Sequence, residues 1–555
     1  MSLKKNDEIV LKIEDMTNEG SSVGHYDGQA VFVSGGVTGD ELCAHIIKAK
    51  KNYAVAKCKS IITPSPDRIL SDCPYSDKCG GCSFRNMTYS SELEYKQRRV
   101  ENALKRIGNI DAPVREIVKA DEINHYRNKA QYPVDIQNGE LVAGFYAHKS
   151  HRIVPCNSCL LQPEEFSLCI DAFSKWAKES GVTSYDEETG KGLLRHIYLR
   201  KAVATGEIMA CAVINGNSLP NENLLVELLS RINGVCSVCV NFNKNDTNVI
   251  LGDQTKIIYG KEYITDILLG KKFVISPNSF YQVNHNQCEK LYSIAGRYAD
   301  LTGNETVVDL YCGAGTIGLT MADKIKTLYG VEIIPQAIEN AKLNAEINGI
   351  NNAEFFCADA FEAAKILENK GIKPDVLILD PPRKGCQSEL FDVVEKMSPK
   401  RIVYVSCDSA TLARDLNILV SKGYKTVEAT PVDMFPRTPH VETVVLLSHK
   451  KPDGHINVKV GFGEGEGKVP LDNIAKRAEE YKPKERVTYK MIKEYIEAKY
   501  GFKVHTAYIA EVKRDLGLPM YDAPNAVEEL KQPRKHPTAE KVEAIKDALK
   551  HFEVI

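Results

Sequence analysis

Cys407 stands at the end of an apolar run, RIVYVSC, where a polar helical segment, DSATLARDL, begins. A thiol at the first turn of a helix can have a lowered pKa, because the helix dipole favours the thiolate. Further along, Glu442 comes directly before another apolar run, where partial burial would raise the pKa of its carboxyl group. The pair could act as nucleophile and base, although buried cysteines are usually inert and such a glutamate is more often a plain strand-edge residue.

A glycine-rich turn, GAGTIG, follows the apolar run ETVVDLYC and precedes a helical segment. Glycines such as Gly313 let the backbone bend tightly and approach a ligand. The next apolar run ends at Glu332, whose carboxylate could accept hydrogen bonds from a ribose diol, and the third ends near Asp359, which could meet an adenine amino group. Acids at successive strand ends predict a nucleotide-like cofactor, and the turn by itself leaves NAD as a competing ligand.

Methylation at carbon 5 of a uracil ring is a reaction that uses such groups together. That carbon is a poor nucleophile, but addition of a thiolate at carbon 6 gives an enolate that can attack a sulfonium methyl group. A base then removes the proton from carbon 5, and the thiol is eliminated. The reaction needs an activated cysteine, a base and a bound methyl donor, which Cys407, Glu442 and the glycine-rich turn could supply.

The elements that must position these residues follow from the apolar patterns of the chain. From about residue 302 to 448, apolar runs alternate with helical segments, as in a doubly wound parallel sheet. Residues 1–64 have short alternating runs between glycines, which predicts a small antiparallel barrel. Residues 112–270 have the mixed pattern of an α+β domain.

The end of the chain differs in character from the rest. Beyond Pro452 a Gly/Glu-rich linker precedes three amphipathic segments that are expected to be helices. Thr488 and Thr506 could cap the first two helices, and the third is expected over residues 539–552.

The overall composition limits where a substrate could bind. The chain has 555 residues, enough for three or four domains, and a formal net charge of −2. No long apolar run and no signal-peptide core are present, so we expect a cytoplasmic protein with no membrane partner. A nearly neutral chain would contact RNA through local basic patches, such as the one formed by Lys48, Lys50, Lys51, Lys57 and Lys59.

Three cysteines, Cys73, Cys79 and Cys82, form the pattern C-x5-C-x2-C. This spacing differs from the C-x3-C-x2-C of radical enzymes that use S-adenosylmethionine. In a reducing compartment, clustered cysteines are more often metal ligands or catalytic thiols than disulfides. Zinc suits a C-x2-C pair, but the wide first gap is unusual for a zinc ribbon.

Five segments, SFYQVN, DLYCGAGTIGL, LDPPRKG, VSCDSATLARD and PHVETV, occur in this order and closely resemble the RNA 5-methyluridine methyltransferase family over residues 5–448. The resemblance implies that Cys407 is the nucleophile and Glu442 the base. The chain departs from the family at Asp408 and Ser409, where Asn-Pro is common. The resemblance also implies S-adenosylmethionine as the methyl donor, with binding residues Gln282, Tyr311, Gly313, Glu332, Asp359 and Asp380.

The same resemblance extends beyond the methyltransferase segments. The N-terminal strands resemble a TRAM domain, and family members carry a four-iron (4Fe-4S) cluster held by the cysteine triad and a fourth cysteine. The resemblance favours Cys159 as the fourth ligand, whereas spacing alone does not separate it from Cys156. The expected domains are a TRAM barrel in 1–64, an α+β domain with the cluster in 65–270, a methyltransferase domain in 271–450, and a linker with a helical appendage in 451–555.

The leading hypothesis is therefore an enzyme that forms 5-methyluridine in RNA. The joint presence of a TRAM domain and a cluster favours 23S ribosomal RNA as the substrate over uridine 54 of transfer RNA. Hypotheses of other classes are a non-catalytic RNA-binding factor for ribosome assembly and an NAD-dependent oxidoreductase built on the same sheet. A monomer is expected.

Overall fold

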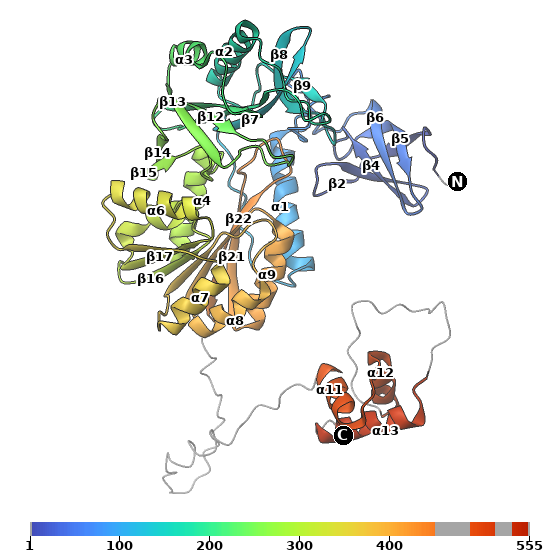
Figure 1. The fold of residues 1–555 in the computed structure, drawn as a ribbon. Coiled ribbons are helices and arrows are strands. Elements are labelled where there is room, and N and C mark those ends of the chain that lie inside the picture. The colour runs from blue at the N-terminus through green and yellow to red at the C-terminus, as the bar shows by residue number, and fades with distance from the viewer. Residues whose placement is uncertain (1–2, 450–488, 517–535, 553–555) are drawn as a thin grey trace. The chain divides into compact units, whose positions relative to one another are not determined.

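The computed structural model describes residues 3–449, 489–516 and 536–552. Contacts divide the chain into two compact units, Met1–His455 and Ile456–Ile555, and each unit is described by itself (Figure 1). The predicted Gly/Glu-rich linker and the predicted cap Thr488 lie outside the described residues.

Six strands at the N-terminus form one sheet in which buried and exposed residues alternate. Leu11, Val31 and Leu42 contribute to its core, because every second residue of a strand faces the same side. This strand-rich part agrees with the sequence, while its closure into a barrel stays a prediction. The strand order is β1-β5-β6-β4-β3-β2, with β1 Glu8–Lys12, β2 Asp15–Met16, β3 Ser22–Tyr26, β4 Gln29–Ser34, β5 Glu41–Ala49 and β6 Tyr53–Thr63.

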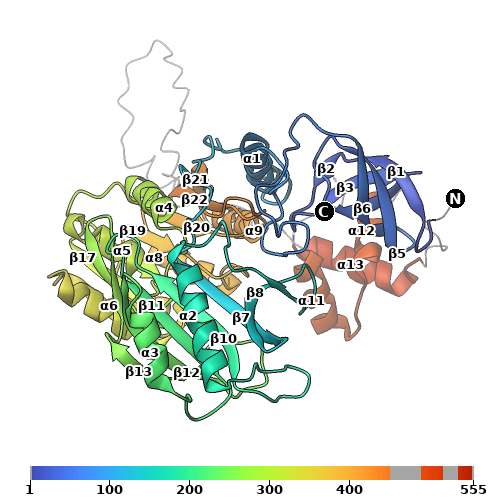
Figure 2. The same cartoon turned by 90° about the horizontal axis from the view of Figure 1, so that it is seen from above.

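The central part begins with a long helix, α1 (Tyr89–Arg106), which starts where the Thr88 hydroxyl accepts a hydrogen bond from Ser91 N. A seven-stranded sheet follows, and α2 (Glu165–Ser180) and α3 (Glu222–Ser230) pack on one of its faces (Figure 2). The strand order is β13-β12-β11-β10-β7-β8-β9, with β7 Lys129–Gln137, β8 Glu140–Tyr146, β9 Ile153–Pro155, β10 Leu194–Lys201, β11 Ile208–Ile214, β12 Val235–Phe242 and β13 Gln254–Gly260. A hairpin, β14 (Ile264–Leu268) with β15 (Lys271–Ile275), leads out of this part.

The third part of the first unit is the predicted doubly wound sheet, in which five strands are parallel and β22 runs antiparallel to both of its neighbours, β20 and β21. The strand order is β18-β17-β16-β19-β20-β22-β21, with β16 Thr306–Leu310, β17 Thr327–Glu332, β18 Ala353–Cys357, β19 Val376–Leu379, β20 Arg401–Ser406, β21 Tyr424–Val432 and β22 Glu442–His449. Its helices are α4 His285–Ala299, α5 Thr316–Thr320, α6 Pro335–Ile347, α7 Ala360–Asn369, α8 Ser388–Met397 and α9 Ser409–Ser421.

The doubly wound sheet is covered on both faces, as its continuous apolar strands require. Val307 belongs to the core that includes α4, whereas its neighbour Val308 belongs to the core that includes α7, α8 and α9. Helix α1 joins the second core through Val100 and Leu104, although it precedes the central sheet in the sequence. The central sheet shares the first core through residues such as Met209, so the central sheet and the doubly wound sheet are packed against each other.

The second unit contains three described helices, α11 (Tyr489–Tyr500), α12 (Thr506–Asp515) and α13 (Ala539–His551), around a small apolar core. The start of α12 differs from the prediction that Thr506 is its cap. His505 Nδ1 accepts a hydrogen bond from Ala507 N at 3.2 Å, and Thr506 is the first helical residue. None of the described helices is long and apolar enough to span a membrane.

Candidate active site

The carboxyl ends of the parallel strands meet at one edge of the doubly wound sheet. Asp309 lies near the end of β16, Glu332 ends β17, Asp380 follows β19 and Cys407 follows β20. The strand order changes direction between β16 and β19, and open α/β sheets bind their ligands at such a point. The fold therefore brings several of the residues expected to act on the cofactor or substrate to a single edge.

The glycine-rich turn is fixed against β17. Tyr311 N donates to Val331 O at 2.9 Å, while Glu332 Oε2 accepts from Gly313 N at 3.2 Å and Oε1 accepts from Ile334 N at 3.0 Å. Tyr311 has a φ of 81°, a left-handed conformation that costs energy for a residue with a side chain. Glu332 is thus held in place by the turn, and its remaining lone pairs could accept hydrogen bonds from ribose hydroxyls.

Asp309 is a buried acid that is absent from the predicted cofactor set. Neither of its carboxyl oxygens has a hydrogen-bond partner among the described residues, and burial raises its pKa to about 7, with the charge of Asp380 adding to the rise. The nearby Gly318 amide offsets part of this rise. A Cβ at position 318 would lie 3.3 Å from Asp309 Oδ2 and 2.9 Å from the Leu328 side chain, so glycine permits the close approach. A buried acid without partners is costly, which points to a ligand at this place.

Cys407 differs from the sequence-based expectation of a lowered thiol pKa. Burial raises its pKa to about 11, and the charges of Glu442 and Asp380 raise it further, whereas Arg383 acts in the opposite direction. Two of the first amides of α9 are occupied by Asp408, which caps this helix: its Oδ1 accepts from Ala410 N at 3.0 Å and from the following amide at 2.9 Å. In the absence of ligands the thiol is therefore protonated at neutral pH.

Glu442 begins β22, the antiparallel neighbour of β20. Ser406 and Thr443 are the last cross-strand pair of β20 and β22. Cys407 directly follows Ser406 and Glu442 directly precedes Thr443, and the charge of Glu442 acts on Cys407. Glu442 is only 4% exposed, and burial raises its pKa to about 8, with a further contribution from Asp380. A thiol and a buried carboxyl group therefore lie close together at this edge of the sheet.

Asp359 and Gln282, two further residues of the predicted cofactor set, form hydrogen bonds with nearby parts of the fold. Asp359 caps α7, since its Oδ1 accepts from Phe361 N at 3.0 Å, and its charge also acts on Tyr311. Gln282 is buried, and its backbone carbonyl accepts from Asn128 Nδ2 at 2.9 Å. Asp359 is thus held close to the glycine-rich turn, while the described contacts of Gln282 attach its backbone to the start of the central sheet.

A cavity of about 490 Å³ opens at Cys407. Its charged lining is mainly cationic and includes Arg99, Arg127 and Arg383, while burial lowers the pKa of His440 to about 4 and leaves that ring neutral. Guanidinium groups bind phosphate well, so the cavity suits an anionic ligand such as a nucleotide. The other lining residues are Asn18, Glu19, Gly80, Gly81, Ser83, His148, Asp408, Thr438 and Pro439.

A buried ion network holds the segment that leads to Glu442. Lys96 of α1 is fully buried, and its Nζ donates to Glu92 Oε1 at 2.7 Å, to Asp433 Oδ1 at 2.6 Å and to Phe435 O at 3.1 Å. Arg437 N donates to the same Glu92 oxygen at 2.7 Å. The network therefore ties this cavity wall to α1. No sequence pattern signals it, because Lys96 and Asp433 are 337 positions apart.

The cysteine segment forms a separate cluster. Cys82 interacts electrostatically with Cys79 and Cys159, and Cys79 interacts with Cys73. Burial raises the pKa of Cys82 to about 12, while a hydrogen bond from Cys156 lowers the pKa of Cys159 to about 6. Four thiols are a suitable donor set for iron, yet in the described parts of the chain no group of three or more Cys, His, Asp or Glu is arranged to hold a metal ion. The predicted iron–sulfur cluster is therefore not shown by this geometry.

The doubly wound sheet, the glycine-rich turn and the acid that ends the second strand define a Rossmann-like methyltransferase. Residues 242–450 match the tRNA (uracil-5-)-methyltransferase family, and residues 3–59 match the TRAM domain. The chain is 45% identical over 450 residues to an uncharacterized RNA methyltransferase of Halalkalibacterium halodurans, covering 81% of this chain and 98% of that protein. A second uncharacterized RNA methyltransferase, from Clostridium tetani, is 44% identical over 448 residues, covering 80% of this chain and 97% of that protein.

The chain therefore belongs to the tRNA (uracil-5-)-methyltransferase family of S-adenosylmethionine-dependent RNA methyltransferases. Among solved structures it is similar to Pyrococcus abyssi tRNA (uracil-54, C5)-methyltransferase in complex with S-adenosyl-L-homocysteine. That similarity has a TM-score of 0.65 and 27% sequence identity, and it covers 79% of this chain and all of the other.

Proposed function

We propose that this enzyme methylates carbon 5 of a uridine in RNA by covalent catalysis, with Cys407 as the nucleophile and Glu442 as the base. The observation that carries the proposal is that Cys407 and Glu442 flank the last cross-strand pair of β20 and β22 and interact there, at the edge where the sheet would bind its cofactor. S-adenosylmethionine supplies the methyl group as a sulfonium.

The reaction then follows from the two side chains. The Cys407 sulfur adds to carbon 6 of uracil, and the electron pair of the 5,6 double bond moves into the enolate. Carbon 5 takes the methyl group, and the sulfonium carbon–sulfur bond breaks with its electron pair left on sulfur. The Glu442 carboxylate removes the proton from carbon 5, the double bond forms again, and Cys407 leaves as a thiolate.

The raised pKa of Glu442, about 8, supports its role as a base. A carboxylate with a pKa close to the working pH is a stronger proton acceptor than an ordinary exposed glutamate. Arg383 acts on both groups, because its charge lowers the pKa of Cys407 and of Glu442. We infer that Arg383 favours the anionic form of each group before the reaction.

The cofactor pocket in this proposal is the edge from β18 to β19. Glu332 would accept hydrogen bonds from the ribose hydroxyls of S-adenosylmethionine, and Asp359 would face its adenine. Asp380 would lie near its sulfonium group, close to Cys407. Asp309 adds a second buried acid there. Two buried acids with pKa values of about 7 suit a cationic ligand, which would favour their charged forms. Tyr311, Gly313 and Gln282 complete the proposed pocket.

We propose 23S ribosomal RNA as the substrate, because the chain has a TRAM domain in addition to the methyltransferase part. Transfer RNA is the second candidate, supported by the structural similarity to the Pyrococcus abyssi enzyme. Mapping 5-methyluridine in both RNA classes from cells that lack this protein separates the two. Loss of the modification only from transfer RNA would contradict the first choice. A monomeric state and a cytoplasmic location are part of the proposal, and light scattering and cell fractionation test them.

We also propose that Cys73, Cys79, Cys82 and Cys159 hold a 4Fe-4S cluster, since these thiols interact within one region. Iron content of Cys159→Ser, compared with Cys156→Ser as its neighbour control, tests the fourth ligand. We expect iron to be lost from the first variant and kept by the second. The reverse result would identify Cys156 as the fourth ligand. A colourless wild-type protein, purified without oxygen, would contradict the proposal of a cluster.

The proposed chemistry has a direct test in Glu442→Gln. Without the base, elimination stops after methyl transfer, so a methylated protein–RNA adduct should accumulate and survive denaturing electrophoresis. Normal release of 5-methyluridine by this variant would contradict the role of Glu442 as the base. Glu428→Gln, a change of another glutamate in the neighbouring strand β21, is the matched control and should release product normally.

A further inference from the structure

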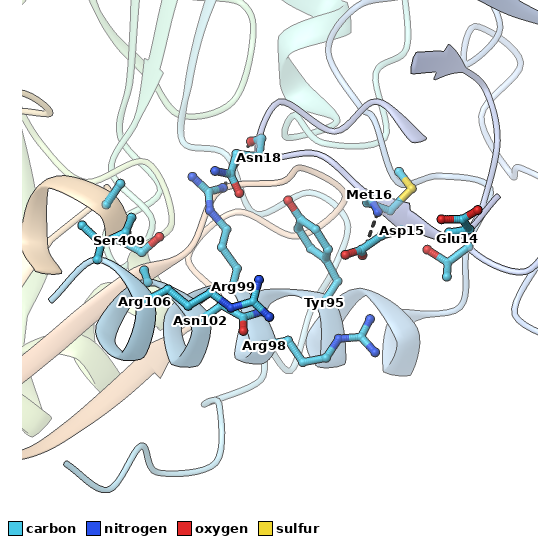
Figure 3. A pocket seen from close by; sticks show the side chains of 14 residues that line it. Glu14, Asp15, Met16, Asn18, Tyr95, Arg98, Arg99, Asn102, Arg106 and Ser409 are labelled. Atoms are coloured by element: carbon cyan, nitrogen blue, oxygen red, sulfur yellow. Dashed lines mark hydrogen bonds between the residues drawn. The ribbon is translucent and has the colours of Figure 1, made fainter. Parts of the chain in front are cut away.

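A second cavity, of about 390 Å³, lies along α1 next to the one at Cys407. Three guanidinium groups of this helix line it, from Arg98, Arg99 and Arg106, together with Asn102 (Figure 3). Its far wall includes Ser409, the first residue of α9. The mechanism proposed above does not use this cavity.

The two cavities adjoin each other, because they share two lining residues. Asn18 and Arg99 line both of them. Arg99 Nη1 donates to Pro439 O at 2.7 Å and to Asn18 O at 3.3 Å, and Pro439 itself lines the Cys407 cavity. Arg99 therefore lies at the boundary of both cavities, and a chain molecule that leaves the Cys407 cavity over Arg99 would reach the second cavity.

The cations of the second cavity are available to a ligand. Arg98 and Arg106 are exposed, and within the described residues neither forms an ion pair or a hydrogen bond. Residues 98, 102 and 106 recur at intervals of four, so they lie on one face of α1. Arg98 and Arg106 thus present two unpaired guanidinium groups on one helix face, and such groups bind phosphates well.

The acids of the cavity are confined to its opposite end. Figure 3 shows Arg106 and Ser409 at one end of the helix face, and Asp15 and Glu14 at the other. Asp15 Oδ1 accepts a hydrogen bond from Met16 N at 2.8 Å, and Glu14 pairs with a histidine of its own sheet. A polyanion would be repelled by the acidic end and attracted to the Arg99–Arg106 end, so the charges define a direction.

We propose that this cavity binds the phosphodiester backbone of the RNA strand that adjoins the target uridine. The strand would pass from the Cys407 cavity over Arg99 and continue toward Arg106 and the start of α9. This inference rests on the proposed function, since it assumes that a uridine of RNA enters the Cys407 cavity. It adds a direction for the substrate strand and a residue, Arg106, that binds RNA without contacting the reacting atoms.

The test compares Arg106→Ala with Lys105→Ala in the full-length enzyme. Both changes remove one exposed positive charge from the same turn of α1, but only Arg106 lines the cavity. We expect Arg106→Ala to raise the KM for RNA about 2- to 5-fold with kcat unchanged, because one exposed charge contact is lost. The slope of log KM against log salt should also fall by about 0.7, as for one phosphate contact to a single strand. Lys105→Ala should match the wild type in both measurements.

Two shortened RNAs locate the contact. One lacks the nucleotides on the 5′ side of the target uridine, and the other lacks those on the 3′ side. The difference between Arg106→Ala and wild type should disappear with one of them and remain with the other. An equal KM for Arg106→Ala and Lys105→Ala, or a difference that persists with both fragments, would overturn the inference. A wild-type enzyme that makes no 5-methyluridine would instead count against the proposed function.

Discussion

Cys407 and Glu442 flank Ser406 and Thr443, the last cross-strand pair of β20 and β22, and the charge of Glu442 acts on Cys407. Cys407 directly follows β20, and Glu442 is the first residue of β22, the antiparallel neighbour of β20. Burial raises the pKa of both groups, to about 11 for Cys407 and about 8 for Glu442, and the charge of Asp380 adds to both rises. The pair is therefore held largely protonated at neutral pH in the free enzyme, and cations must change that state before the reaction.

The pH dependence of the free enzyme should follow both Glu442 and Cys407. The base and the nucleophile act when they are deprotonated, so kcat/KM should rise with pH through the Glu442 pKa of about 8 and continue to rise above it, because the Cys407 pKa is about 11. Initial rates of methyl transfer, measured from about pH 6 to about pH 9 with RNA below its KM, give this profile. Activity that falls steadily over the same range would contradict the assignment of the base.

Arg383→Ala should shift that profile to higher pH. The Arg383 charge lowers the pKa of Cys407 and of Glu442, so its removal should leave both groups more protonated. We expect methyl transfer at neutral pH to slow about 3- to 10-fold, with partial recovery at higher pH, since one pKa unit corresponds to a tenfold change. Lys384→Ala removes the neighbouring exposed charge and should leave the profile unchanged. Equal effects of the two changes would contradict the inference that Arg383 lowers the pKa values of Cys407 and Glu442.

Asp309→Asn should make the ligand-free enzyme more stable at high pH. The pKa of Asp309 is raised to about 7 in the folded protein, so its protonated form is favoured and stability is lost as pH rises through that value. The asparagine variant lacks this pH-dependent loss of stability. Its free energy of unfolding should exceed that of the wild type by roughly 2 kcal/mol at about pH 8 and equal it at about pH 4. Thermal unfolding at both pH values measures the difference. An equal gain at both would show that the acid is not the cause.

Lys96→Met should destabilise the protein strongly. It removes the cation from two carboxylates, Glu92 and Asp433, and leaves them buried without their partner. Breaking such a buried pair costs about 3–5 kcal/mol, whereas an exposed change on the same helix, Lys105→Met, should stay within about 0.5 kcal/mol. Urea unfolding of both variants provides the comparison. A loss below about 1 kcal/mol for Lys96→Met would show that the network does not hold the 433–440 segment.

The sequence predicted the methyltransferase fold because its strands are continuous apolar runs that each end in a polar residue. Glu332, Asp380 and Cys407 could be placed at one edge for that reason, since the carboxyl ends of parallel strands meet there. The pKa of Cys407 could not be predicted with the right sign. Its dominant causes are burial and the charges of Asp380 and Glu442, and these become neighbours only in the folded sheet.

Contacts between segments that are distant in the chain could not be predicted from the sequence either. Lys96 and Arg99 look like ordinary charges of an amphipathic helix, yet one is buried against Asp433 and the other contacts Pro439. The lack of hydrogen-bond partners around Asp309 is likewise visible only when neighbouring strands are in place. For the cysteines, the sequence predicts more than the structure shows. Their spacing resembles a cluster motif, whereas the described residues include no group arranged to hold a metal ion.

Trapping with RNA that carries 5-fluorouridine at the target position tests the proposed role of Cys407 most directly. Fluorine cannot be removed as a cation, so elimination is blocked and the covalent complex should persist. With S-adenosylmethionine present, the wild type should form a denaturant-stable adduct whose digest carries the methylated nucleotide on the peptide containing Cys407, and Cys407→Ala should form none. An adduct of equal yield with Cys407→Ala, or one attached to another residue, would contradict the proposed mechanism.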